Sequence, residues 1–135
     1  MIRDFFFYGT LIAGSGNDHE RAAHALMDEG RAQVTRGRLY AVPDPAGWYP
    51  ALLPGAGIVR GMVYRAGPRF DARALARMDE YEGRDYRRGL IRVGLGMAQA
   101  YLWRGALPRG ARRIAGGDFH AWLAACRGRR AYRAD

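Results

Sequence analysis

The sequence predicts an α+β fold in which a curled mixed sheet is flanked by helices. Two observations support this prediction. Segments with the alternating or aromatic pattern of strands outnumber segments with helical periodicity. Most of these strands are also neighbours in the sequence, which favours a curled sheet over a regular alternation of strands and helices. With 135 residues and no evident linker, we expect a single domain over residues 1–135.

The first two expected elements are a strand and a helix. Residues 2–8 are apolar and aromatic, as in a buried strand. Residues 12–17 are then expected to form a glycine-containing loop. A helix capped by Asn17 or Asp18 should extend to about residue 29, because a glycine directly follows as a stop.

The middle of the chain contains two further strands and a second helix. Residues 32–42 and 58–66 show partial period-two alternation, and the segment 43–57 between them, rich in proline and glycine, is expected to be a loop. A helix is predicted from the cap Asp71 to Tyr81. The inward-facing candidates in the two strands are Val34, Leu39, Tyr40, Ile58, Met62 and Tyr64.

The last part of the chain predicts a hairpin and a third helix. Strands are expected at 86–94 and 97–104, joined by a turn at Gly94-Leu95-Gly96. In the helix expected over 117–126, one apolar stripe contains Phe119, Trp122, Leu123 and Cys126. Cys126 is therefore interpreted as a core thiol. A single cysteine suits a reducing compartment, so the cytoplasm is the expected location.

The charge of the chain suggests nucleic-acid binding, but its distribution does not support that function. The net charge is +9, and all 22 basic residues are arginines scattered along the chain, apart from a group at 127–133. We therefore expect a solvated basic surface, with weak, non-specific nucleic-acid binding that salt abolishes. No apolar run approaches the ~20 residues of a membrane span. A basic RNA-associated domain stays the less favoured alternative.

Several familiar catalytic and metal-binding motifs are absent. The three histidines, His19, His24 and His120, lack the spacing of a helical metal pair, so no metal site is predicted. Ser15 lies between two glycines but not in a nucleophile elbow. A phosphate-binding loop would need a lysine, and the sequence has none.

One carboxylate stands out, that of Glu82, where the second predicted helix gives way to a strand. The helix dipole disfavours an anion there, and aromatic neighbours such as Tyr81, Tyr86 and Trp48 would desolvate it. Both effects would raise the pKa of Glu82 and make it a proton acceptor near neutral pH. The alternative is a surface carboxylate paired with one of three nearby arginines, Arg84, Arg87 or Arg88.

Three sequence blocks, in this order, resemble the gamma-glutamylcyclotransferase-like family. They are Phe-Tyr-Gly-Thr-Leu at 7–11, Tyr-Pro-Ala-Leu at 49–52, and Met-Asp-Glu-Tyr-Glu-Gly at 78–83 with Tyr-Arg-Arg at 86–88. The resemblance is strongest to the short branch that includes gamma-glutamylamine cyclotransferase, and it covers roughly residues 4–104. Ile12 departs from the pattern, where a basic residue is common, and Met78 replaces the usual aliphatic residue.

The resemblance implies a small mixed β-barrel with helices outside, and a cyclising reaction. In this reaction the α-amine of a gamma-glutamyl compound attacks its own side-chain carbonyl, which closes 5-oxoproline and expels an amine. The resemblance aligns Glu82 with the family's general acid/base. It implies no metal and no cofactor, and a small gamma-glutamyl compound as the partner.

The resemblance also implies a substrate-binding set. It aligns a glycine turn with the family's substrate-binding loop, and main-chain N–H groups in this turn can bind a carboxylate or an oxyanion. Arg88 is a candidate for holding the substrate carboxylate, or else a structural partner of Glu80. The full substrate-binding set is Tyr8, Gly9, Thr10, Leu11, Tyr86 and Arg88. A non-catalytic small-molecule-binding member of the same fold is the main alternative, and the leaving amine and oligomeric state stay open.

Overall fold

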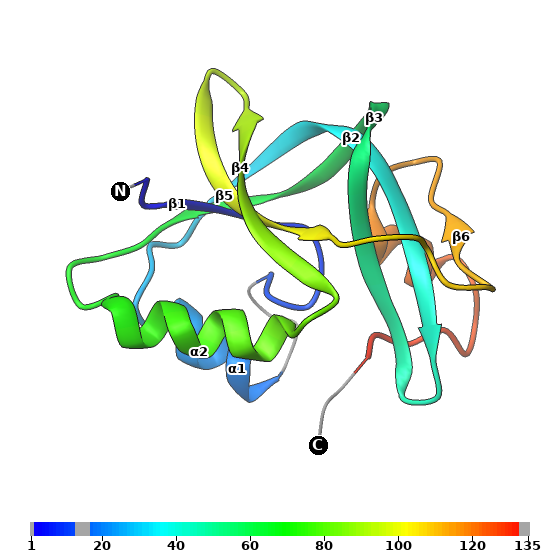
Figure 1. Cartoon of the computed structure of the whole chain (residues 1–135), viewed down its shortest axis with the longest axis horizontal. Helices are drawn as coiled ribbons and strands as arrows, with labels where there is room; N and C mark the ends of the chain where they lie inside the picture. The colour runs from blue at the N-terminus through cyan, green and yellow to red at the C-terminus, as the bar shows by residue number, and fades with distance from the viewer. Residues whose placement is uncertain (1, 13–16, 133–135) are drawn as a thin grey trace.

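Five strands close into a small mixed barrel in the computed structural model, which describes residues 2–12 and 17–132 (Figure 1). The strand order is β3-β1-β5-β4-β2, and pairing of β2 with β3 closes the ring. β1 is parallel to β5, and the other neighbours are antiparallel. The predicted α+β fold and mixed barrel are therefore confirmed. The strands are β1 (Asp4–Phe7), β2 (Arg31–Asp44), β3 (Gly47–Arg65), β4 (Tyr86–Val93) and β5 (Gly96–Trp103).

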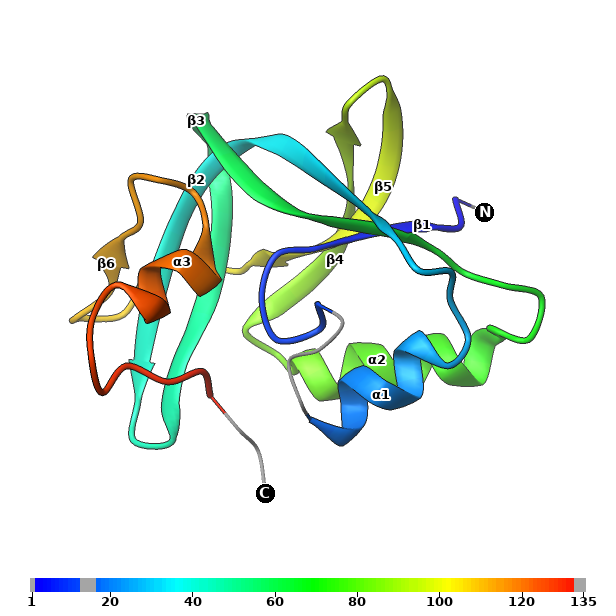
Figure 2. The same ribbon diagram turned by 180° about the vertical axis from the view of Figure 1, so that it is seen from behind.

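Outside the barrel, the described residues form three helices and one short strand. They are α1 (Asp18–His24), α2 (Ala72–Glu82), β6 (Arg112–Arg113) and α3 (Phe119–Ala124). α1 and α2 lie side by side on one side of the barrel, whereas β6 and α3 lie at the other end, beside β2 (Figures 1 and 2). Each helix begins at a side-chain cap, because the oxygen of Asn17, Asp71 or Asp118 accepts a main-chain N–H of the first turn. None of the helices in the described residues has the length and apolarity needed to cross a bilayer.

β1 separates two hydrophobic clusters and buries both of its faces. Phe6 and Tyr8 belong to a cluster within the barrel that Phe119 of α3 also joins. Phe5 and Phe7 belong to a second cluster, which packs the barrel against α1 and α2. Burial on both sides explains why the predicted first strand is an unbroken apolar run instead of an alternating one.

The expected loop over 43–57 is wrong, because most of it belongs to the long β2–β3 hairpin. Asp44 pairs with Gly47 at the turn, and the pairs Pro43–Trp48 and Ala41–Pro50 follow. Proline is tolerated in a strand where its nitrogen is not required for a ladder hydrogen bond. The proline content therefore suggested a loop, although Ala51 and Leu52 in the same segment are buried as strand residues.

Two inward-facing candidates and the end of the first helix are also corrected. Val34 is 37% exposed and Ile58 50% exposed, because their neighbours Thr35 and Val59 take the inward positions. α1 ends at His24, about five residues earlier than expected, because the chain after it turns into the approach to β2.

The third helix is shorter than predicted, and this exposes Cys126. α3 ends at Ala124, so Cys126 lies beyond the helix and is exposed. The prediction of a core thiol is therefore wrong, although Phe119 is buried and Trp122 and Leu123 pack against the core as expected. The hairpin between β4 and β5 forms where predicted. Residues 13–16, with Ser15, and Arg133 of the basic tail lie outside the described residues.

Candidate active site

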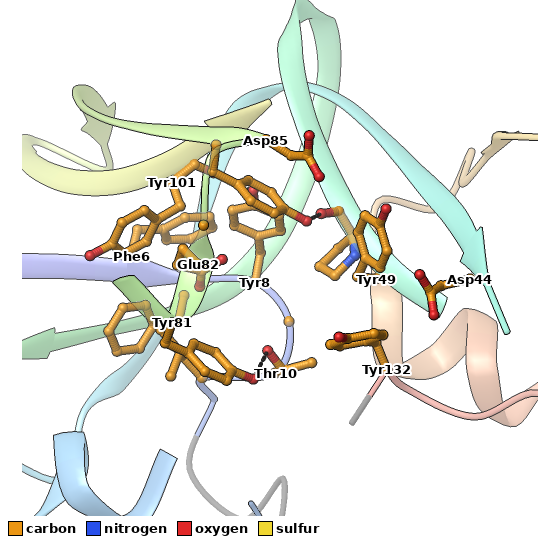
Figure 3. A pocket seen from close by; sticks show the side chains of 16 residues that line it. Phe6, Tyr8, Thr10, Asp44, Tyr49, Tyr81, Glu82, Asp85, Tyr101 and Tyr132 are labelled. Carbon is orange, nitrogen blue, oxygen red and sulfur yellow. Dashed lines mark hydrogen bonds between the residues drawn. The ribbon is translucent and has the colours of Figure 1, made fainter. Parts of the chain in front are cut away.

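A cavity of about 290 Å³ opens where β1, the β2–β3 hairpin and the end of α2 meet (Figure 3). Its wall combines aromatic rings with carboxylates. Glu82 and the whole Tyr8–Leu11 turn line it, so the structure brings these two sequence blocks together. The lining residues are Phe6, Phe7, Tyr8, Gly9, Thr10, Leu11, Asp44, Tyr49, Pro50, Tyr81, Glu82, Gly83, Asp85, Tyr86, Tyr101 and Tyr132.

Glu82 is the last residue of α2 and is partly buried in this cavity. Gly83 follows at φ +80°, a backbone conformation that favours glycine, and turns the chain toward β4. Among the described residues, Glu82 has no hydrogen-bond or ion-pair partner. Burial, together with the negative charge of Asp79, raises the pKa of Glu82 to about 8. The carboxyl is therefore unpaired and titrates near neutral pH, instead of forming the surface ion pair considered as the alternative.

Four tyrosines surround the carboxyl and hold their hydroxyls in fixed positions. Burial raises the pKa of Tyr8 and of Tyr86, and the Glu82 charge raises both further. These phenols therefore stay neutral. Each hydroxyl donates to an acceptor: Tyr8 to the carbonyl of Tyr101, Tyr86 to the carbonyl of Pro50, Tyr81 to Thr10 Oγ1 at 3.0 Å, and Tyr101 to Asp79 Oδ1 at 2.6 Å. The rings thus form a wall around Glu82 in which each hydroxyl is held by a hydrogen bond.

Three carbonyl groups of the Tyr8–Leu11 turn accept hydrogen bonds from protein donors. The Gly9 carbonyl accepts from the Ile12 N–H at 3.1 Å and from His120 Nε2 at 3.0 Å. The Thr10 carbonyl accepts from Asn17 Nδ2 at 3.0 Å, and the Leu11 carbonyl accepts from His24 Nε2 at 2.5 Å. Side chains of α3, of the α1 cap and of α1 therefore fix the peptide planes of this turn.

Fixing these carbonyls also fixes the N–H groups. In a trans peptide the N–H points opposite to the C=O of the same unit, and the described residues contain no cis peptide. The Thr10 and Leu11 N–H groups therefore point away from the donors that hold the Gly9 and Thr10 carbonyls. Neither N–H has a hydrogen-bond partner among the described residues. Because Thr10 and Leu11 line the cavity, we infer that these two N–H groups are candidates for binding an anion there.

Gly9 is required because Pro50 packs against it. Its φ is not positive, but a Cβ atom at this position would lie 2.3 Å from Pro50 Cγ. Gly9→Val is expected to lower stability by about 1–3 kcal/mol through overpacking and to weaken ligand binding. Thermal unfolding and KM measure these effects. Gly96→Val is the control, because a Cβ there meets nothing within 4 Å, and equal behaviour of the two variants would contradict the packing argument.

His120 is expected to act as a positioning residue for the turn. Loss of its hydrogen bond to the Gly9 carbonyl removes about 1 kcal/mol of local stabilisation, so His120→Ala should raise KM several-fold and change kcat less. His120→Gln keeps an N–H donor and should restore most of the loss. Steady-state kinetics measure whether KM changes more than kcat, and an unchanged KM in His120→Ala would disprove the positioning role of His120.

Two sequence candidates lie outside the cavity lining. Arg88 Nε donates to Asp79 Oδ1 at 2.9 Å, and Arg88 also contacts Gln99. The carboxylate partner of Arg88 is therefore Asp79, not Glu80, and Arg88 links β4 to α2 and β5 instead of lining the cavity. Trp48 packs against Trp122, with ring centroids 5.0 Å apart, so it does not desolvate Glu82. Tyr86, in contrast, lines the cavity.

The structure also adds residues that sequence analysis missed. Asp79 accepts hydrogen bonds from Tyr101 and Arg88 and raises the pKa of Glu82. It lies inside the acidic sequence block, so its position was a usable signal. Asp44 and Tyr132 reach the cavity from the hairpin turn and the C-terminal segment, and nothing in their local sequence indicates this.

Comparison with known proteins places the chain in a family. The model of the family described as "Gamma-glutamyl cyclotransferase, AIG2-like" matches residues 5–121. The chain belongs to the gamma-glutamylcyclotransferase-like family. It is 33% identical over 120 residues to the gamma-glutamylcyclotransferase family protein YtfP of Escherichia coli K12, which covers 87% of this chain and 94% of YtfP.

Solved structures show the same fold. The uncharacterized protein PH0828 from Pyrococcus horikoshii superposes with a TM-score of 0.64 at 23% identity, over 93% of this chain and 95% of that one. An AIG2-like protein from Mus musculus superposes with a TM-score of 0.56 at 22% identity, over 81% and 80% of the two chains. At these identities the likeness concerns the fold. The barrel of this cyclotransferase-like chain is thus the family's barrel.

Proposed function

We propose that this family member is a cyclotransferase that converts a gamma-glutamyl amide into 5-oxoproline and a free amine. One observation carries the proposal: Glu82, which has no partner in the described part of the chain and a pKa raised to about 8, shares a cavity with the Tyr8–Leu11 turn. A carboxyl with this pKa can both accept and return a proton near neutral pH. The substrate already contains its nucleophile, so the site needs to fold it and move its protons.

The proton balance of the reaction fits one carboxyl group. The Glu82 carboxylate takes a proton from the substrate's α-ammonium, and the freed amine attacks the side-chain carbonyl carbon. A C–N bond then forms in the five-membered ring, and the amide C–N bond to the leaving amine breaks. Glu82 passes protons from the attacking nitrogen to the leaving nitrogen, so that two protons of the original ammonium end on the released amine.

Main-chain N–H donors of the Tyr8–Leu11 turn supply the electrostatic stabilisation that the reaction needs. The tetrahedral intermediate places negative charge on the former carbonyl oxygen, and the substrate also carries an α-carboxylate. The Thr10 and Leu11 N–H groups have no hydrogen-bond partner among the described residues and are held in place, so they are suited to bind one of these anions. The neutral tyrosines line the same cavity, and electrostatic contacts are stronger beside such groups than in bulk water.

Release of 5-oxoproline tests the proposed function. The purified protein is incubated with gamma-glutamyl amides of small amines and with gamma-glutamyl dipeptides, and 5-oxoproline and the amine are quantified by mass spectrometry. Equimolar release of both products is expected. Binding without release from any compound would support the non-catalytic alternative. Location in the cytoplasm is part of the same proposal, because the single cysteine of the chain suits a reducing compartment.

A further inference from the structure

One part of the cavity plays no role in the cyclisation described above. Asp44, Tyr49, Asp85 and Tyr132 line it, and we call these four residues the outer subsite. Asp44 and Tyr132 lie at one side of the cavity and Glu82 at the other (Figure 3). Glu82 and the outer subsite line one continuous space, so a substrate with its reacting carbonyl at Glu82 has room to extend its leaving group toward the outer subsite.

The aromatic part of the outer subsite is held rigidly. The rings of Tyr49 and Tyr132 have centroids 5.7 Å apart and planes at 83°, so they form a corner. Tyr49 also stacks on Trp103, with centroids 6.0 Å apart. Tyr132 is fixed because its N–H donates to the Trp48 carbonyl at 2.6 Å. Two ring faces at a right angle are a common receptor for an organic cation.

The charged part of the outer subsite is purely acidic. Asp44 and Asp85 form no ion pair with any basic residue in the described parts of the chain, and the Asp44 Oδ1 atom accepts only the Ala46 N–H at 2.9 Å. Burial raises the pKa of Tyr49, and the charges of Asp85 and Asp44 raise it further. Within residues 2–12 and 17–132, no arginine or histidine lines the cavity, although the chain has 22 basic residues.

We propose that the outer subsite binds a second ammonium group on the leaving amine, so that the preferred substrates are gamma-glutamyl diamines. The inference rests on the proposed function. The reaction is the same: the amide C–N bond breaks, and the diamine leaves with the protons that Glu82 transfers. The ammonium at the far end of the diamine contacts the Tyr49 and Tyr132 faces, and Asp44 and Asp85 balance its charge. A leaving amine that carries a carboxylate would meet repulsion there.

A matched substrate series tests the charge preference. Three gamma-glutamyl amides have the same four-methylene chain and end in an ammonium, a methyl or a carboxylate group. We expect the wild-type protein to turn over the ammonium compound with a kcat/KM about tenfold or more above the methyl compound, and the carboxylate compound least. In Asp44→Asn/Asp85→Asn this preference should fall to about threefold or less. The double variant Glu29→Gln/Glu80→Gln removes two exposed charges and should keep it.

The outcomes separate this inference from the proposed function. Equal turnover of the ammonium and methyl compounds overturns the outer-subsite inference and leaves the cyclotransferase proposal standing. If no compound releases 5-oxoproline, the proposed function fails, and the binding of the ammonium compound relative to the methyl compound, measured by calorimetry, decides the subsite alone. Tighter binding of the ammonium compound, lost in Asp44→Asn/Asp85→Asn, supports a cation site, and equal binding overturns it.

Discussion

Glu82→Gln is expected to lower 5-oxoproline formation by about 100-fold or more, the usual cost of removing a general base. The amide is almost the same size as the carboxyl but cannot accept the proton from the substrate's ammonium. Substrate binding should change much less, because the Thr10 and Leu11 N–H groups stay in place. Single-turnover kinetics on a confirmed substrate measure the loss.

The control for this variant is Glu80→Gln, which removes the same charge from an exposed position on the same helix. It should retain nearly full activity. Glu82→Gln should also fold: the folded-state pKa of Glu82 lies above its usual value of 4.5, so its ionisation opposes folding. The stability of Glu82→Gln relative to the wild type should therefore increase as the pH rises from about 4.5 through 8. Near wild-type turnover by Glu82→Gln would disprove the assignment.

The pH dependence of kcat/KM is expected to show the raised pKa of Glu82. Only the carboxylate accepts a proton, so kcat/KM should rise with pH, with a midpoint near pH 8. Below that value the rate should fall about tenfold for each pH unit. A carboxyl with an ordinary pKa would instead give a flat profile between pH 6 and 8.

Two checks make the pH experiment specific. The residual activity of Glu82→Gln should lose the rise toward pH 8, because its side chain does not titrate. Asp79→Asn removes the charge that contributes to the raised pKa and should move the midpoint to lower pH. A midpoint that stays at the same pH in Glu82→Gln would assign it to another group, such as the substrate ammonium.

The fold was predictable where burial leaves a periodic pattern. The aromatic run at the N-terminus indicated β1 because both of its faces are covered. The caps Asn17 and Asp71 marked the starts of α1 and α2. The β2–β3 hairpin was missed, because prolines such as Pro50 were interpreted as loop residues although the hairpin accommodates them. The ends of α1 and α3 depend on contacts with the barrel, which local sequence does not contain.

The site was predictable only for residues that belong to compact motifs. Glu82 and the Tyr8–Leu11 turn occur in short recognisable blocks, and they line one cavity. The ion-pair partner of Arg88 is Asp79, which faces it from α2. Local sequence does not show which acidic residue of α2 faces β4. His120 and Tyr132 come from the C-terminal segment, where no family pattern was visible, and reach the site only through the folding of that segment over the β2–β3 hairpin.

The most direct test of the central claim is the fate of oxygen during turnover. A gamma-glutamyl amide is incubated with the protein in water enriched in oxygen-18, and the products are analysed by mass spectrometry. Intramolecular attack by the α-amine predicts 5-oxoproline without the heavy isotope, together with one equivalent of free amine, in the wild type and not in Glu82→Gln. Glutamate that contains oxygen-18 would show hydrolysis by water and would contradict the account.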